Sequence, residues 1–281
     1  MADQVQSRED QSQMYDHILL THKGAAREVA VVTMNRPKHA NAMLPAMALE
    51  LENAIKTAID EGSVKAIILT GAGKHFCAGA DAQHIRETYD GIARGKHPAE
   101  PFDGNLRALH RAAAAIFVSP KPVIAAINGS ATAGGLDLAL ACDYRLASVS
   151  AKFGESYIKL GLPPLNGGAW LLPRIVGPSR AFRLLMTGEV LDTETALAIN
   201  LIDEICDGAD LGDQALAFAQ QVARAPSDLL AFIKAELKAN GSYADALART
   251  YVGGVGFSKT EYFNRAIEKL PRKAVTPAPT S

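Results

Sequence analysis

Two glycine-rich turns, at residues 76–81 and 128–135, hold the backbone groups with the clearest chemical potential. Each follows an apolar, strand-like run, and the second leads into a predicted helix that starts at Gly134. Small residues let a ligand approach the backbone, and a helix start leaves N–H groups without an internal partner. Two such N–H groups from separate turns would stabilise negative charge on a carbonyl oxygen, as an oxyanion hole does. Taken alone, either turn is more readily explained as a tight turn without chemical function.

Other patterns of binding and catalysis do not fit this sequence. The Gly71-Ala72-Gly73 run has Phe76 where a dinucleotide-binding motif needs its third glycine, and His75 stands where a phosphate-binding loop needs Ser or Thr. The seven histidines end at His110 and lack metal-ligand spacing, so we expect no metal site. No histidine follows the serine of GESYI (154–158), which excludes the Ser-His-Asp arrangement of the α/β-hydrolase fold.

Composition excludes several classes of partner. Lys and Arg number 29 against 30 Asp and Glu, so no excess of positive charge favours binding to nucleic acid. The three cysteines are widely spaced, which argues for a reducing compartment and against a disulfide framework. The polar start is unlike a signal peptide, and the longest apolar run, 112–118, is far too short to span a membrane. We therefore expect a cytoplasmic protein without membrane contact.

Hydrophobic periodicity predicts the elements that must position the two turns. Strands are expected at 29–34, 66–69, 122–127 and 144–147, and helices at 43–60, at 106–117 and from Gly134, with a short helix that Asp81 caps. Strands that alternate with helices indicate an α/β protein with a largely parallel sheet. The stretch 89–104 has no period and is predicted to be a surface loop. Helical patterns dominate after Gly168, with one further strand expected at 201–205.

Three stretches of the chain resemble the crotonase (enoyl-CoA hydratase/isomerase) superfamily. They are IILTGAGKHFCAGAD (67–81), PVIAAINGSATAGGLDLALACDYRLAS (122–148) and AKFGESYIKLGLPPLNGGAWLLPRIVG (151–177). NRPKHANAM, at 35–43, matches the exit from the family's first strand. The resemblance implies a ββα-spiral core, a C-terminal helical region for oligomerisation and a coenzyme A thioester as ligand. No cofactor other than this substrate is expected.

The resemblance also implies a domain organisation. A crotonase-like core would span 15–205 and a helical oligomerisation region 206–270, between disordered ends at 1–14 and 271–281. The helices of the second region carry more apolar residues than a solvated appendage should, namely Leu229, Leu230, Phe232, Ile233 and Leu237. We therefore expect a homotrimer or homohexamer.

Matching motif positions imply roles for individual residues. The backbone N–H groups of Ala78 and Gly134 would hold the thioester oxygen. The nucleotide end of coenzyme A would be flanked by two segments: Lys38, His39 and Ala40 in the first, and Ala78, Gly79, Ala80 and Asp81 in the second.

The sequence departs from the family at its acid/base positions. A hydratase of this family places water between two glutamates, and those positions hold Asp137 and Tyr157 here. Asp137 keeps a carboxylate and is the expected general base. Tyr157, with an ordinary pKa of about 10, would donate a hydrogen bond or a proton, or would only line the acyl pocket. Glu155 could supply the missing carboxylate only if its turn were remodelled, and Leu165 occupies a slot where some isomerases and dehalogenases have aspartate.

These observations predict an acyl-CoA enzyme that passes through a stabilised enolate, of the enoyl-CoA hydratase/isomerase class with an atypical acid/base pair. Cleavage of a C–C bond and decarboxylation are alternatives, because both need enolate stabilisation but fewer carboxylates. A protein that binds coenzyme A thioesters with little catalysis is a further alternative.

Overall fold

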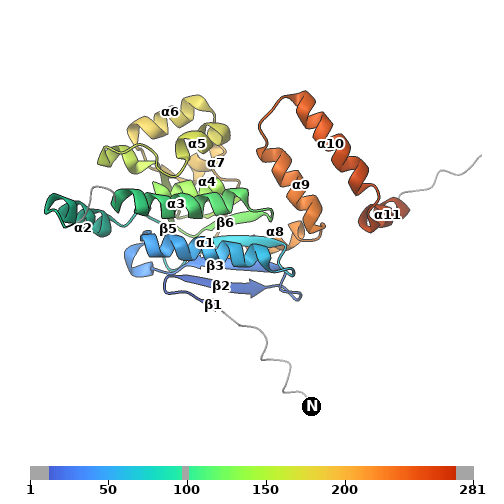
Figure 1. Ribbon diagram of the computed structural model, residues 1–281, viewed down its shortest axis with the longest axis horizontal. Helices are drawn as coiled ribbons and strands as arrows, with labels where there is room; N and C mark the ends of the chain where they lie inside the picture. The colour runs from blue at the N-terminus through green and yellow to red at the C-terminus, as the bar shows by residue number, and fades with distance from the viewer. Residues whose placement is uncertain (1–12, 97–100, 270–281) are drawn as a thin grey trace, which may run out of the picture. The chain divides into compact units, whose positions relative to one another are not determined.

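The computed structural model describes residues 13–96 and 101–269, which divide into two compact units at Arg224 (Figure 1). This division differs from the expected boundary after residue 205. Helix α8 (Leu211–Val222) belongs to the first unit, because Leu211, Ala215 and Ala219 are buried against the main sheet. Of the expected disordered ends, only Gln13–Met14 is described, and it forms a strand. The rest of both ends lies outside the described residues.

The main sheet has mixed direction. In spatial order its strands are β1 (Gln13–Met14), β2 (Ile18–Lys23), β3 (Val29–Met34), β4 (Ala66–Gly71), β6 (Val123–Ile127), β8 (Tyr144–Ser148) and β11 (Glu204–Cys206). The pairs β1–β2 and β2–β3 are antiparallel, and all later pairs are parallel. The prediction of a largely parallel sheet is confirmed.

The strands of this sheet are apolar throughout because both faces are covered. Successive side chains of a strand point to opposite faces, and in β4 Ile67 and Leu69 join one core whereas Ala66 and Ile68 join another. The first core lies under α1 (Pro45–Asp60) and α3 (Pro101–Val118), and the second lies under α8. No helix in the described ranges has both the length and the apolar content that crossing a membrane requires.

A smaller sheet carries the loops of interest. Its strands, in spatial order, are β10 (Leu191–Asp192), β9 (Lys152–Gly154), β7 (Ser130–Thr132) and β5 (His75–Cys77). The neighbours β5, β7 and β9 are parallel. Carboxyl ends of parallel strands lie at one edge of a sheet, so the segments that follow these three strands meet there.

The remaining helices of the first unit connect these strands. They are η1 (Pro37–His39), α2 (Ala82–Ala93), α4 (Gly134–Ala141), η2 (Ser156–Leu160), α5 (Gly168–Val176), α6 (Pro178–Thr187) and α7 (Thr193–Ala198). The prediction of a loop over 89–104 is wrong at both ends, because α2 continues to Ala93 and α3 begins at Pro101. The positions 97–100 between them lie outside the described residues.

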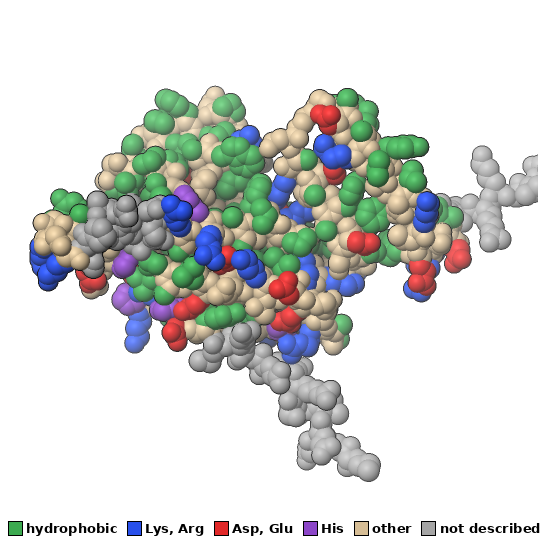
Figure 2. Space-filling model, in the orientation of Figure 1, with side chains coloured by type: hydrophobic (Ala, Val, Ile, Leu, Met, Phe, Trp, Pro, Cys, Tyr) green, Lys and Arg blue, Asp and Glu red, His purple; other side chains and the backbone are tan. Residues whose placement is uncertain are grey.

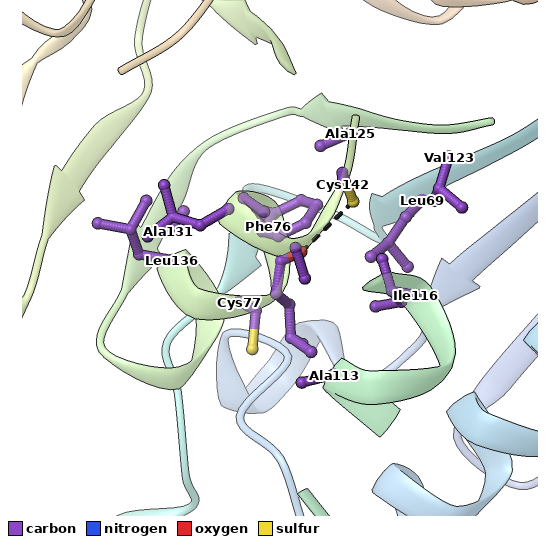
Figure 3. Close-up of a cluster of buried hydrophobic side chains, with 14 of the residues drawn as sticks. Leu69, Phe76, Cys77, Ala113, Ile116, Val123, Ala125, Ala131, Leu136 and Cys142 are labelled. Atoms are coloured by element: carbon purple, nitrogen blue, oxygen red, sulfur yellow. Dashed lines mark hydrogen bonds between the residues drawn. The ribbon is translucent and has the colours of Figure 1, made fainter. Parts of the chain in front are cut away.

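Buried side chains fix the starts of the site loops. Phe76 and Ala131 are fully buried, and Leu136 of α4 is 1% exposed. Figure 3 shows these three side chains in one cluster with Leu69 and Ile116 from the main core. Burial of a phenylalanine stabilises a fold by roughly 1.5–3 kcal/mol, so the strand ends that carry the site are held rigidly.

The second unit consists of helices α9 (Ser227–Lys238), α10 (Tyr243–Phe257) and α11 (Glu261–Glu268). The rings of Phe232 and Phe257 pack edge to face at 5.5 Å, and Arg249 pairs with Glu236 at 2.8 Å. None of the residues in α10 or α11 is buried. Figure 2 shows apolar side chains along the exposed surface of α10.

Candidate active site

The two glycine-rich turns predicted from the sequence meet at the carboxyl edge of the small sheet. Gly79, after β5, lies so close to the start of α4 that a Cβ built on it would be 3.1 Å from the nitrogen of Gly134. Gly79 also has a φ of +91°, which a side chain would strain. Glycine is therefore required at the point where the two turns touch.

The backbone donors of the first turn differ from the expectation. The N–H of Ala78 donates to the carbonyl of Ala40 at 3.0 Å, so it is engaged within the chain. That Ala78 supplies a donor to the thioester oxygen therefore stays a prediction. The left-handed backbone of Gly79 interrupts the extended chain, and within the described residues the next N–H, on Ala80, makes no hydrogen bond.

The N–H of Gly134 is the second candidate donor. Gly134 is the first residue of α4, where backbone N–H groups have no partner inside the helix. Its N–H makes no hydrogen bond with any described residue. The positive end of the α4 dipole favours negative charge at the same place. The expected donor role of Gly134 stays a prediction, for which this N–H is free among the described residues.

The two expected acid/base residues lie in direct contact. The hydroxyl of Tyr157 donates to Oδ2 of Asp137 at 2.5 Å, and the N–H of Asn166 donates to the same oxygen at 3.3 Å. Asp137 is fully buried and Tyr157 is 7% exposed. A Cβ on Gly134 would lie 3.3 Å from the Tyr157 hydroxyl. The phenol therefore lies beside both Asp137 and the N-terminal end of α4.

Burial changes the acidity of this pair. Burial raises the pKa of Asp137 to about 6, although hydrogen bonds from Tyr157 and from the Asn166 N–H act in the opposite direction. Burial, followed by the negative charge of Asp137, raises the pKa of Tyr157 above its ordinary value. At neutral pH the pair consists of an Asp137 carboxylate and a neutral phenol.

Glu155 is a third acidic group that the sequence placed only conditionally at the site. It is 1% exposed, and it directly precedes η2, the helix that carries Tyr157. A Cβ on Gly168 would lie 2.2 Å from Oδ1 of Asp137 and 3.0 Å from Oε1 of Glu155. The two carboxyl groups therefore face the same point. Burial and then the charge of Asp137 raise the pKa of Glu155 to about 9.

A cavity of about 300 Å³ adjoins these groups. Tyr157, Ala78, Ala80 and Asp81 line it, whereas Asp137 is not among the lining residues. Most of the wall is apolar and includes Met43, Ile85, Leu106, Leu109, Leu162 and Leu165. At this wall Leu165 places a hydrocarbon side chain where some isomerases and dehalogenases have an aspartate. The cavity thus combines an apolar lining with one phenol and the backbone of the two turns.

The segment expected to flank the nucleotide of coenzyme A is held in place by hydrogen bonds to other parts of the chain. Asn41, fully buried, donates from Nδ2 to the carbonyls of Ala72 and His75, at 2.9 and 2.7 Å. Ala40 joins this segment to the first turn through the Ala78 N–H. The two remaining residues of the prediction, Lys38 and His39, are exposed and do not line the cavity.

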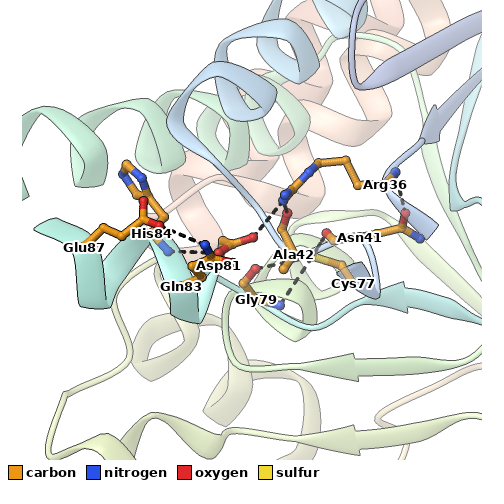
Figure 4. Close-up of polar contacts among 9 residues, drawn as sticks. All are labelled: Arg36, Asn41, Ala42, Cys77, Gly79, Asp81, Gln83, His84 and Glu87. Carbon is orange, nitrogen blue, oxygen red and sulfur yellow. Dashed lines mark hydrogen bonds and ion pairs between the residues drawn. The ribbon is translucent and has the colours of Figure 1, made fainter. Parts of the chain in front are cut away.

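Asp81 has two structural contacts. Its carboxylate caps α2 by accepting from the His84 N–H at 2.9 Å, as predicted, and pairs with Arg36 at 3.0 Å (Figure 4). Burial acts to raise the pKa of Asp81, but these partners outweigh it and the pKa lies below its ordinary value. Arg36 and Asn41, both in the NRPKHANAM stretch, are positioning residues that sequence analysis did not single out.

Comparisons with known proteins identify the family of this chain. Residues 24–256 match the model of the enoyl-CoA hydratase/isomerase family. A probable enoyl-CoA hydratase of Mycobacterium tuberculosis is 37% identical over 228 residues, 81% of this chain and 84% of that protein. A 1,2-epoxyphenylacetyl-CoA isomerase of Escherichia coli is 34% identical over 218 residues, 77% of this chain and 80% of the relative.

Solved structures agree as well. The crystal structure of an enoyl-CoA hydratase from Bacillus anthracis superposes with a TM-score of 0.82 at 27% identity and covers 90% of this chain and 95% of the other. The crotonase-like α/β fold predicted from the motifs is confirmed. The alternative of a binding protein without catalysis has no support among the named relatives, which are hydratases and isomerases. The chain is an enoyl-CoA hydratase/isomerase-like enzyme and belongs to the enoyl-CoA hydratase/isomerase family of the crotonase superfamily.

Proposed function

We propose that this enzyme moves a proton at the carbon next to the thioester carbonyl of an acyl-CoA, through an enolate, in an isomerase-type reaction. The observation that carries the proposal is the Tyr157 hydroxyl, which lines the cavity, lies 2.5 Å from Asp137 and adjoins the start of α4. An acid/base group at the cavity thus lies beside the start of α4, whose backbone N–H groups favour an anion.

The N–H groups of Ala80 and Gly134 hold the thioester oxygen in this mechanism. Both are without a partner among the described residues, and they come from two turns that touch at Gly79. When the carbonyl becomes an enolate, negative charge develops on this oxygen and strengthens both hydrogen bonds. Removal of one such donor typically costs about 10²- to 10³-fold in rate.

Asp137 and Tyr157 together accept the substrate proton. Only Tyr157 reaches the cavity, so its oxygen takes the proton from carbon while its own proton passes to Oδ2 of Asp137. Asp137 and Tyr157 together change from one negative charge to none. The acyl group of the substrate changes from neutral to an anionic enolate. Return of a proton to a different carbon completes an isomerisation. No cofactor is needed, because the chain supplies every group in this cycle.

Hydration by two carboxylates suits this site less well. That reaction holds a water between two carboxylates, and the second position is a phenol whose raised pKa keeps it neutral. The largely apolar wall supports a hydrocarbon acyl group as substrate. The exposed apolar residues of α10 and α11 support association into a trimer or hexamer.

Deuterium exchange tests the proposal with simple thioesters in place of the natural substrate. The enzyme is incubated in D₂O with saturated acyl-CoA thioesters, for which no net reaction follows enolate formation. Mass spectrometry should show deuterium at the α-carbon, and wild-type enzyme heated beyond unfolding serves as the control. Thioesters that bind and yet acquire no deuterium would overturn the proposed enolate.

A further inference from the structure

Glu155 is a buried acid that the proposed proton transfer does not use. It is 1% exposed and lies outside the cavity lining. Both of its carboxyl oxygens are buried without a hydrogen-bond partner in the described part of the chain, and Oδ1 of Asp137 is in the same condition. A buried polar atom without a partner costs about 1–3 kcal/mol relative to a paired one, so this arrangement requires an explanation.

Among the residues that the structure describes, no cation compensates the two carboxyl groups. The side chains of Tyr157 and Glu155 influence the pKa of Asp137, and Asp137 influences the pKa of Glu155. Nearby helices carry arginines with other partners: Arg174 stacks on Trp170 at 3.7 Å, and Arg183 pairs with Glu189 at 2.8 Å. Lys159 of η2 is exposed at the cavity wall. Two carboxylates that share a buried site without a cation cannot both ionise at ordinary cost.

We infer that Glu155 is protonated in the resting enzyme and shares its proton with Oδ1 of Asp137, so that the two carboxyl groups carry a single negative charge. One proton between Oε1 and Oδ1 provides a hydrogen bond for two of the three orphaned oxygens, because both of these face the point above Gly168. Glu155 is a positioning residue: it keeps the charge on Asp137 and directs Oδ2 toward Tyr157. The effect of Glu155 on catalysis rests on the proposed function, whereas the protonation of Glu155 does not.

Stability as a function of pH tests the protonation directly. A carboxyl whose pKa is raised on folding binds more protons in the folded chain than in the unfolded chain, here between pH 4.5 and about 9. Its contribution to the free energy of unfolding is therefore fully present below pH 4.5 and falls as pH rises toward 9. Glu155→Gln keeps the shape and a donor but cannot ionise. Relative to wild type, its Tm should rise progressively from about pH 5 to about pH 9.

The control for this experiment is Glu194→Gln, which alters an exposed acid in the first turn of α7. Its Tm should follow the wild-type curve at every pH. A Glu155→Gln curve parallel to wild type, or one that falls below it as pH rises, would overturn the inference. Either result would mean that Glu155 is ionised in the folded enzyme.

Infrared spectroscopy provides a second test. It needs no substrate, and it does not depend on measuring the stability of the variant. The wild-type minus Glu155→Gln difference spectrum at neutral pH should contain the carbonyl stretch of a protonated carboxyl group. A difference spectrum with only carboxylate bands would overturn the inference. Because neither test measures turnover, a protonated Glu155 in an enzyme that fails the deuterium-exchange test would reject the proposed function alone.

Discussion

The hydroxyl of Tyr157 donates a 2.5 Å hydrogen bond to Oδ2 of Asp137, and of these two residues only Tyr157 lines the cavity. The two residues are 20 positions apart, and they come together because α4 and η2 follow neighbouring parallel strands, β7 and β9. A base that reaches its substrate through a second side chain has a distinct signature in mutant kinetics. The loss of either residue should affect the chemical step more than ligand binding.

Asp137→Asn should abolish proton acceptance while it preserves the size of the side chain. We expect kcat, and the rate of α-carbon exchange in D₂O, to fall about 10²- to 10⁴-fold, the usual range for loss of a general base. Affinity for acyl-CoA should change little, because in the proposed mechanism backbone N–H groups hold the thioester oxygen. Glu194→Gln is the matched control on an exposed acid. An Asp137→Asn enzyme with a kcat near wild type would remove Asp137 from the mechanism.

Tyr157→Phe should lower kcat and shift the pH profile of the remaining activity. Asp137 works as a carboxylate, so wild-type activity should be present above its pKa of about 6 and be lost as pH falls through that value. The Tyr157 hydrogen bond lowers this pKa, so its removal should move the acidic limb of kcat/KM toward higher pH. An unshifted limb with an unchanged kcat would show that Tyr157 only lines the cavity.

Gly168→Ala should displace the catalytic carboxylate without preventing folding. The new Cβ would lie 2.2 Å from Oδ1 of Asp137, well inside van der Waals contact, although alanine suits the first position of α5. We expect kcat to fall at least about tenfold, since small misplacements of catalytic groups are costly. Gly212→Ala in α8 is the control, because its Cβ would meet nothing within 4 Å. Equal activity of the two variants would contradict the geometry at Gly168.

The helical unit should mediate oligomerisation. Tyr251 and Val252 of α10 are 74% and 71% exposed, and Leu237 of α9 is 82% exposed, which is unfavourable for a monomer in water. Light scattering should give three or six times the chain mass of 29.8 kDa. Val252→Glu should shift the distribution toward monomer at low concentration, whereas Gly212→Ala should not. A wild-type protein that stays monomeric at high concentration would refute the expectation.

Local sequence patterns determined the elements and most of the chemical groups of this protein. Continuous β-branched runs such as 29–34 identified buried strands, Asp81 identified a helix start, and the motif positions singled out Gly134, Asp137 and Tyr157. These features follow from side-chain periodicity, capping and motif matching. They do not depend on how distant segments meet.

Only the tertiary structure decided which groups are free and which groups face one another. Ala78 loses its N–H to the carbonyl of Ala40, so the donor role moves to Ala80 in the proposed mechanism. Glu155 joins Asp137 because irregular backbone before η2 turns it inward, where Gly168 leaves room for both carboxyl groups. Hydrogen-bond partners and burial depend on contacts between segments far apart in the chain, and local sequence patterns carry little information about such contacts. The burial that raises the pKa of Asp137 and of Glu155 therefore exists only in the folded chain.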